Sequence, residues 1–149
     1  MQTTQTRPAP PTQVRNLNGS ALIRRGFLAC RASSGNIASI PGIASDATLR
    51  RHVLALVQAV ETGLHEAAQL AISHPTPATL GDAFNATDAV QAICRKAGRR
   101  AGVVGKARTQ ARLQVFLAGV KTGLAELEAG LECIPLLPCT APDYPEVEE

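Results

Sequence analysis

The segment VETGLHE, residues 60–66, is repeated sixty residues later as VKTGLAE, residues 120–126. Around each copy, aliphatic residues recur at alternating spacings of four and three, which is the heptad pattern of a helix that buries one face. The first stripe consists of Val53, Val57, Val60, Leu64, Ala67 and Ala71, and the second of Leu113, Leu117, Val120, Leu124, Leu127 and Leu131. The repeat therefore predicts two long helices, over about 46–73 and 106–132, in an all-α fold.

We expect the two stripes to pack directly against each other, but these two helices need further partners. Burial of their Val and Leu side chains does not offset the conformational entropy lost when both helices become ordered. Two other segments show helical spacing: a weak helix over 20–32 with Ile23, Phe27 and Cys30, and a third long helix over about 85–98 with Val90, Ile93, Cys94 and Ala97. We therefore expect a small bundle of three or four helices, with a homodimer as the preferred way to complete the core.

The 149 residues are enough for one domain with tails. Residues 1–19 are polar, basic and proline-rich, which predicts a disordered arm, and residues 135–149 form a proline-rich acidic tail. A single helical domain over 20–134 remains. Within it, the Gly, Pro and Ser content of 33–45 predicts a loop, and Gly98, Gly102 and Gly105 predict that the third helix ends near Gly98.

Charge is distributed in blocks along the chain. The net charge is only +3, yet residues 89–125 contain eight cations and no acid, whereas residues 126–149 contain seven acids and no cation. Such segregation creates a local potential that the net charge conceals. Seven cations fall in the short stretch 94–112, and these are the candidate binding residues: Arg95, Lys96, Arg99, Arg100, Lys106, Arg108 and Arg112.

Three interpretations of this basic stretch stay open. The first is a small accessory protein, acting as an adaptor, regulator or inhibitor, that binds an acidic or helical protein partner. The second is a nucleic-acid-binding protein that contacts backbone phosphates through residues 95–112; a helix-turn-helix over 79–96, with its turn at 85–87, is a weaker variant. The third is a structural role, in which the acidic tail folds back and neutralises the cations.

The sequence contains no pattern that indicates a catalytic site or a bound cofactor. His52, His65 and His74 are not spaced for a shared helix face, and Cys30, Cys94, Cys133 and Cys139 form no C-x-x-C pair. We therefore expect a protein that is not an enzyme, with no metal and no cofactor. No apolar run is long enough for a membrane-spanning helix, so a cytoplasmic protein with no membrane partner is expected.

Overall fold

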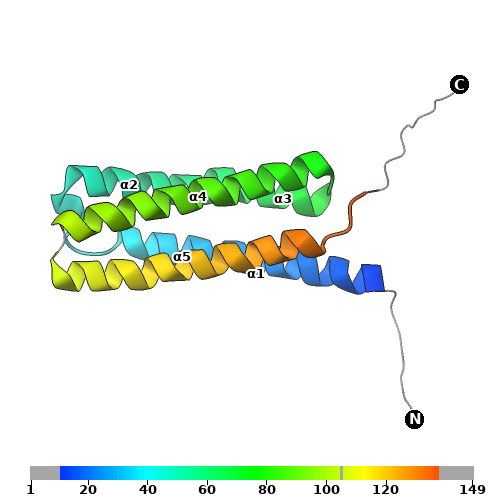
Figure 1. Ribbon diagram of the computed structural model, residues 1–149, viewed down its shortest axis with the longest axis horizontal. Coiled ribbons are helices and arrows are strands. Elements are labelled where there is room, and N and C mark those ends of the chain that lie inside the picture. Colours follow the sequence, from blue (N-terminus) through cyan, green and yellow to red (C-terminus); the bar gives the residue numbers. More distant parts are fainter. Residues whose placement is uncertain (1–10, 105, 138–149) are drawn as a thin grey trace, which may run out of the picture.

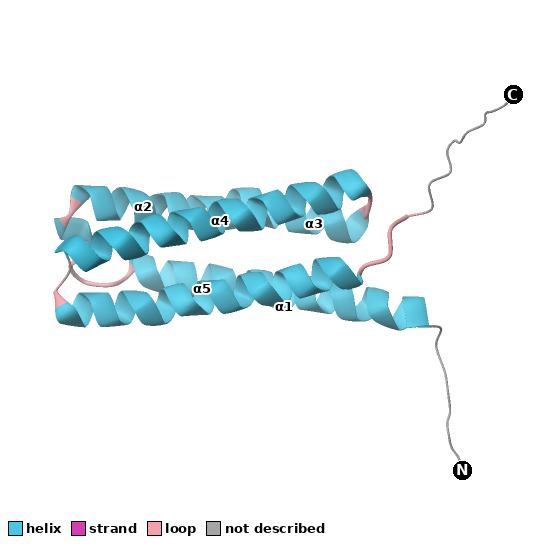
Figure 2. Ribbon diagram, in the orientation of Figure 1, coloured by secondary structure: helices cyan, strands magenta, loops and turns pink. Residues whose placement is uncertain are grey.

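Four helical rods run up and down along one axis. The computed structural model describes residues 11–104 and 106–137. The helices are α1 (Pro11–Ala38), α2 (Ala47–Gln58), α3 (His65–Ser73), α4 (Pro77–Val104) and α5 (Ala107–Cys133). A π-helical turn, η3 (Ala59–Leu64), joins α2 to α3 in one continuous rod. All regular elements in the described residues are helical, including the short 3-10 turn η2, Ile43–Ser45 (Figure 2). The predicted all-α bundle is confirmed.

The rods form two antiparallel pairs (Figure 1). α1 and α5 make the most extensive contact of any two helices, and α4 packs mainly against the α2–α3 rod. The pairs stack through contacts of α4 with α5 and of α1 with α2 and α3. Each rod therefore lies beside the next one in the chain, and the last lies beside the first, as in an up-and-down four-helix bundle. The core is enclosed by one chain.

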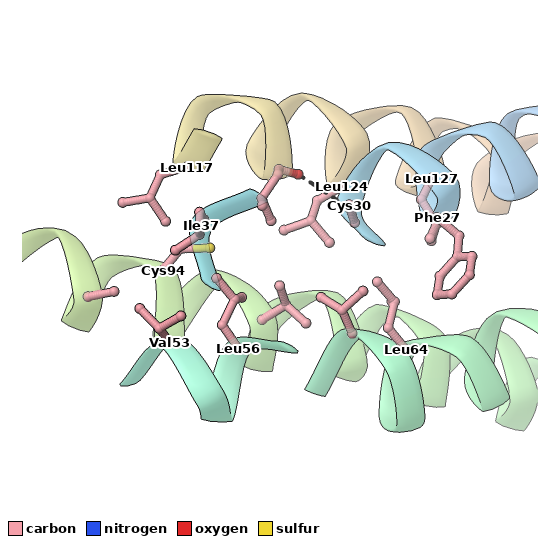
Figure 3. Packing of buried hydrophobic residues seen from close by; sticks show 14 of the residues in the cluster. Phe27, Cys30, Ile37, Val53, Leu56, Leu64, Cys94, Leu117, Leu124 and Leu127 are labelled. Atoms are coloured by element: carbon pink, nitrogen blue, oxygen red, sulfur yellow. Dashed lines mark hydrogen bonds between the residues drawn. The ribbon is translucent and has the colours of Figure 1, made fainter. Parts of the chain in front are cut away.

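Aliphatic side chains from all four rods meet along the axis (Figure 3). All six residues of the second stripe, from Leu113 to Leu131, are buried, as predicted. The predicted helical faces of α1 and α4 are buried as well, except that Ile93 is only partly covered. The Cys30 thiol lies in this core and donates a hydrogen bond to the carbonyl oxygen of Val120, at 3.4 Å. Heptad spacing therefore identified three of the four inward faces correctly.

The prediction for the first stripe is correct only in part. Val53, Val60, Leu64 and Ala71 are buried, but Val57 and Ala67 are only partly covered, and Leu56 and Ala68 lie in the core instead. At Ala67 the cause is the π-helical turn, which inserts one extra residue. Up to Val60, near the start of the turn, the buried positions are Leu49, Val53, Leu56 and Val60, a heptad that would continue at 63, 67 and 70. From Leu64, the last residue of the turn, they are Leu64, Ala68 and Ala71, each one residue later. Val57 precedes the turn, and its neighbour Leu56 fits the spacing between Val53 and Val60 equally well.

The helices that carry the two stripes are not neighbours. The sequence led us to expect that the stripes pair directly, but α5 packs against α1 and α4, and the α2–α3 rod lies diagonally across the core. The reason is the close contact between α1 and α5. A Cβ atom on Gly26 would lie 2.5 Å from the carbonyl oxygen of Gly123, and one on Gly130 would lie 2.5 Å from that of Gly19. Backbone therefore touches backbone along this pair.

Helix α4 is longer than predicted at both ends. Its start at Pro77, instead of Asn85, is set by Thr76, whose side-chain oxygen accepts a hydrogen bond from the Thr79 amide at 3.1 Å. It also continues through Gly98 and Gly102 to Val104, because Cys94, Ala97 and Ala101 are buried on both sides of Gly98. The predicted helix end at Gly98 is wrong, and the helix-turn-helix is excluded because residues 85–87 lie inside a continuous helix.

Helix α1 is also longer than the weak helix predicted over 20–32. It begins at Pro11 and continues to Ala38, into the predicted loop. Ser34 and Ile37 are both fully buried and extend the spacing of Ile23, Phe27 and Cys30 by four and three residues. The Gly and Ser residues of 33–38 led us to predict a loop where the helix in fact continues. Residues 1–10 of the predicted arm and 138–149 of the predicted tail lie outside the described residues, so the domain boundaries stay a prediction.

Candidate binding surface

The candidate cations gather at one end of the bundle, where α4 ends and α5 begins (Figure 1). The chain reverses between Val104 and Lys106, which brings the last two turns of α4 beside the first two turns of α5. Six of the seven candidate side chains are exposed there: Arg95, Lys96, Arg99, Lys106, Arg108 and Arg112. Residues that are consecutive in the sequence therefore form one cationic region in space.

Arg100 is the exception, because it forms an ion pair. Its Nε and Nη2 atoms donate hydrogen bonds to the two carboxylate oxygens of Asp46, at 3.0 Å and 2.9 Å. Asp46 is the N-cap of α2 and also accepts from the Leu49 amide at 2.7 Å. The Arg100 hydrogen bonds and the Leu49 amide lower the pKa of Asp46 to about 2. Arg100 therefore ties α4 to the start of α2 and is removed from the candidate binding residues.

Two further cations belong to this region, and the block analysis missed them. Arg50 and Arg51 are exposed on the first turns of α2, at the same end of the bundle. They fall in a sequence block whose net charge is negative, and the ion pair between Arg100 and Asp46 shows that the start of α2 lies beside α4.

We call this region the basic end and define it by eight exposed residues. They are Arg50, Arg51, Arg95, Lys96, Arg99, Lys106, Arg108 and Arg112. Asp46 is the acid that the structure places among them, and it is already paired with Arg100. The acids of α4 and α5, in contrast, lie toward the other end: Asp82, Asp88, Glu126, Glu128 and Glu132. Within the described residues, the bundle is therefore polarised along its axis.

This arrangement opposes two of the four helix dipoles at this end of the bundle. Cations are favourable where α1 and α4 end, because the C-terminus of a helix carries a partial negative charge. They are unfavourable where α2 and α5 begin, which is where Arg50, Arg51, Lys106 and Arg108 lie. α5 also starts at Lys106 without a side-chain cap. Neighbouring like charges repel one another as well, so we expect that neutralising the cations at the starts of α2 and α5 raises the stability of the fold.

Two exposed valines accompany the cations. Val103 follows Arg95 and Arg99 at helical spacing on α4, and its side chain is 76% exposed. Val115 follows Arg108 and Arg112 on α5 and is 66% exposed. Each helix thus presents two arginines and one aliphatic side chain in a row. The basic end combines charge with exposed apolar surface.

The two buried cysteines, Cys30 and Cys94, do not supply a reactive group to this surface. Burial, assisted by the nearby Cys94 thiol, raises the pKa of Cys30 to about 12, and burial raises that of Cys94 to about 11. Both thiols therefore stay protonated at neutral pH. Residues 11–104 and 106–137 contain no group of three or more His, Cys, Asp or Glu side chains placed to hold a metal ion. In the same residues, no helix is long and apolar enough to cross a membrane.

Comparisons of the chain with protein-family models, with curated proteins and with solved structures found no match. Function is therefore inferred from the geometry and the charge of this chain alone.

Proposed function

We propose that the chain is a non-enzymatic accessory protein that binds an acidic surface of a protein partner through the basic end. The observation that carries this proposal is the gathering of eight exposed cations of α2, α4 and α5 at one end of the bundle, where two of these helices begin. Because two of those helices begin there, the charge opposes their dipoles, and surface charge that served only solubility would avoid such positions. A binding partner that supplies negative charge compensates for the repulsion.

The exposed valines favour a protein over a nucleic acid. Protein interfaces combine apolar contacts at the centre with charged and polar groups around them, and the rows that end in Val103 and Val115 offer both. Phosphate contacts need cations alone. Complementary charge would also steer the encounter and raise the association rate. An adaptor, a regulator or an inhibitor would each use such a surface.

The first test compares two matched double charge reversals. Arg95→Glu with Arg99→Glu alters the basic end, and Arg24→Glu with Arg31→Glu alters the exposed face of α1. We expect the unaltered protein and the α1 variant to recover one stoichiometric acidic protein from extracts of the native host. The basic-end variant should associate with that protein about tenfold or more slowly, because steering by charge is lost. Equal association of both variants would refute the proposal.

A titration with duplex nucleic acid tests the alternative, in which the partner is a nucleic acid. If a nucleic acid is the natural partner, the logarithm of affinity should fall linearly with the logarithm of salt, by about 0.9 per neutralised phosphate. The basic-end variant should then lose duplex binding while the α1 variant keeps it. If this is observed and no protein partner is recovered, the proposal of a protein partner is refuted, and binding to a nucleic acid backbone takes its place.

Self-association remains a separate prediction. The four rods of one chain already enclose the core, so a homodimer would form through outer surfaces such as the exposed Leu54 and Leu70 of the α2–α3 rod. Sedimentation equilibrium over a range of protein concentrations tests this. A single monomeric species at all concentrations would rule out the dimer.

A further inference from the structure

A groove of about 450 Å³ lies between α1 and α3, away from the basic end. Its floor is apolar and includes Phe27 from α1 and Ile72 from α3. Leu28 also lines the groove and is 57% exposed. The groove is therefore an apolar surface that the described residues leave open.

Two arginines line this groove. Arg24 and Arg31 are both exposed and stand on the same side of α1 as Leu28, at spacings of four and three residues. Arg25, in contrast, points away to Glu126 of α5 and forms an ion pair with it at 2.8 Å. The groove thus offers an apolar floor with positive charge along one wall. An occupant should carry acidic side chains and at least one large apolar side chain.

The π-helical turn shapes the far end of the groove. Glu61 lies within this turn, and His65 directly follows it; both line a smaller hollow that shares Phe27 and Arg31 with the groove. The ring of His65 lies against that of Phe27, with centroids 4.9 Å apart. π-helical turns occur frequently at functional sites, because the extra residue redirects side chains out of the regular helix face. Here the turn directs an acid and an imidazole to the end of the groove.

The chain after α5 leads to the near end of the same groove. Ile134 is buried against Gly19. The amide of Leu137 then donates a hydrogen bond to the carbonyl oxygen of Pro75, at 2.8 Å. Ser73, which lines the groove, is two residues before Pro75. The residues that follow Leu137 therefore start beside the groove.

We propose that residues 138–149 dock in the groove between α1 and α3. This segment, PCTAPDYPEVEE, has the chemistry that the groove requires: four acids, no cation, and Tyr144 between Asp143 and Glu146. In this arrangement Tyr144 packs on the apolar floor beside Phe27 and Leu28. The carboxylates of Asp143 and Glu146 pair with Arg24 and Arg31.

Reach favours the groove over the basic end. From Leu137 to Asp143 an extended chain spans about 20 Å at most. The groove extends along α3 from Ser73 to His65, which is about 12 Å of helix. Arg112, the nearest cation of the basic end on α5, lies about 30 Å back along that helix. Asp143 and Tyr144 can therefore reach the groove but not the basic end, which only the residues from Glu146 onward could approach in an extended chain.

Tyr144 itself provides the test, because the chain has one tyrosine and no tryptophan. Acrylamide quenching of its fluorescence in the full chain measures how well this side chain is covered. We expect weaker quenching than in a free peptide of residues 138–149. Arg24→Glu with Arg31→Glu, and separately Leu28→Glu, should both raise quenching to the peptide value. All three substitutions are on exposed positions, and circular dichroism checks that the helices persist.

The matched control is Arg95→Glu with Arg99→Glu, which should leave the protection of Tyr144 unchanged. Quenching in the unaltered chain equal to that of the peptide would overturn the proposal. Release of Tyr144 by the Arg95 and Arg99 reversals, but not by the groove variants, would also overturn it and place the segment at the basic end. Because the readout needs no partner, its result is independent of the proposed function.

Discussion

The two copies of the V-x-T-G-L motif, residues 60–64 and 120–124, show how differently one local sequence can be used. In both copies the Val and the Leu are buried. In the first copy the backbone forms a π-helical turn, and a Cβ on Gly63 would meet nothing within 4 Å. In the second copy the backbone is α-helical, and a Cβ on Gly123 would lie 2.7 Å from the Gly26 carbonyl oxygen. The glycine is dispensable in one copy and essential in the other.

The strongest test of this contrast is to delete each glycine. Deleting Gly63 removes the extra residue of the π-helical turn and leaves Leu64, Ala68 and Ala71 on the heptad of the preceding helix, so the protein should still fold. Deleting Gly123 rotates Leu124, Leu127 and Leu131 by about 100° away from the core. We expect that variant to lose cooperative unfolding, measured by thermal melts followed by circular dichroism. If the Gly63 deletion unfolds as well, our explanation of the π-helical turn fails.

The next test replaces each glycine by alanine. Gly123→Ala should destabilise the fold by about 3 kcal/mol or more, because the new methyl group meets backbone and the Cys30 sulfur at distances that require the helices to separate. Gly63→Ala should be neutral or stabilising by up to about 1 kcal/mol, since alanine favours helical backbone. Urea unfolding measures both. Gly35→Ala, in open space on α1, serves as a second control; equal effects at Gly63 and Gly123 would contradict the backbone contact.

A smaller effect on stability is expected at the N-cap of α2, the helix that leads into the first copy of the motif. α2 starts at Asp46, whose pKa is lowered to about 2, whereas an unperturbed aspartate titrates near 3.8. The folded state therefore gains stability above about pH 4 and loses it as the pH falls through this range toward 2. We expect Asp46→Asn to destabilise the protein at pH 7 and the difference from the unaltered chain to shrink toward pH 2.

Arg100→Gln provides the check on that interaction. At pH 7 the effects of Asp46→Asn and Arg100→Gln on the free energy of unfolding should not add, because either change removes the same ion pair. Near pH 2 the coupling should disappear. Additive effects at both pH values would show that the ion pair does not stabilise the fold in solution.

The smallest expected effect is at Lys106, where α5 begins without a side-chain cap. Lys106→Asp supplies a cap and a negative charge at a helix N-terminus, which should stabilise the protein by about 0.5–1 kcal/mol. It also removes one cation from the basic end, so binding of the acidic partner should weaken. Urea unfolding and binding on the same sample test both effects. A variant that is less stable than the unaltered chain would contradict our account of the helix dipoles.

The sequence predicted the inward faces because they depend only on local spacing. The buried positions of α5 follow from a heptad that no other element disturbs. It failed at Ala67, because a π-helical turn is not encoded by a pattern of apolar residues, and at Val57, because the adjacent Leu56 fits the same spacing. It also failed at Gly26, which looks like a helix-weakening residue until the opposite backbone is known. The same limit explains Arg50 and Arg51, whose place beside Arg99 depends on how the rods are arranged.

The central claim is that the basic end lowers stability and serves binding. The direct measurement replaces Arg50, Arg51, Lys106 and Arg108, the four cations at the starts of α2 and α5, by glutamine and determines, on that one variant, the free energy of unfolding at low salt and the rate of association with the recovered acidic partner. We predict a protein at least as stable as the unaltered chain that associates about tenfold or more slowly. A variant that is destabilised yet associates at the unaltered rate would contradict the account.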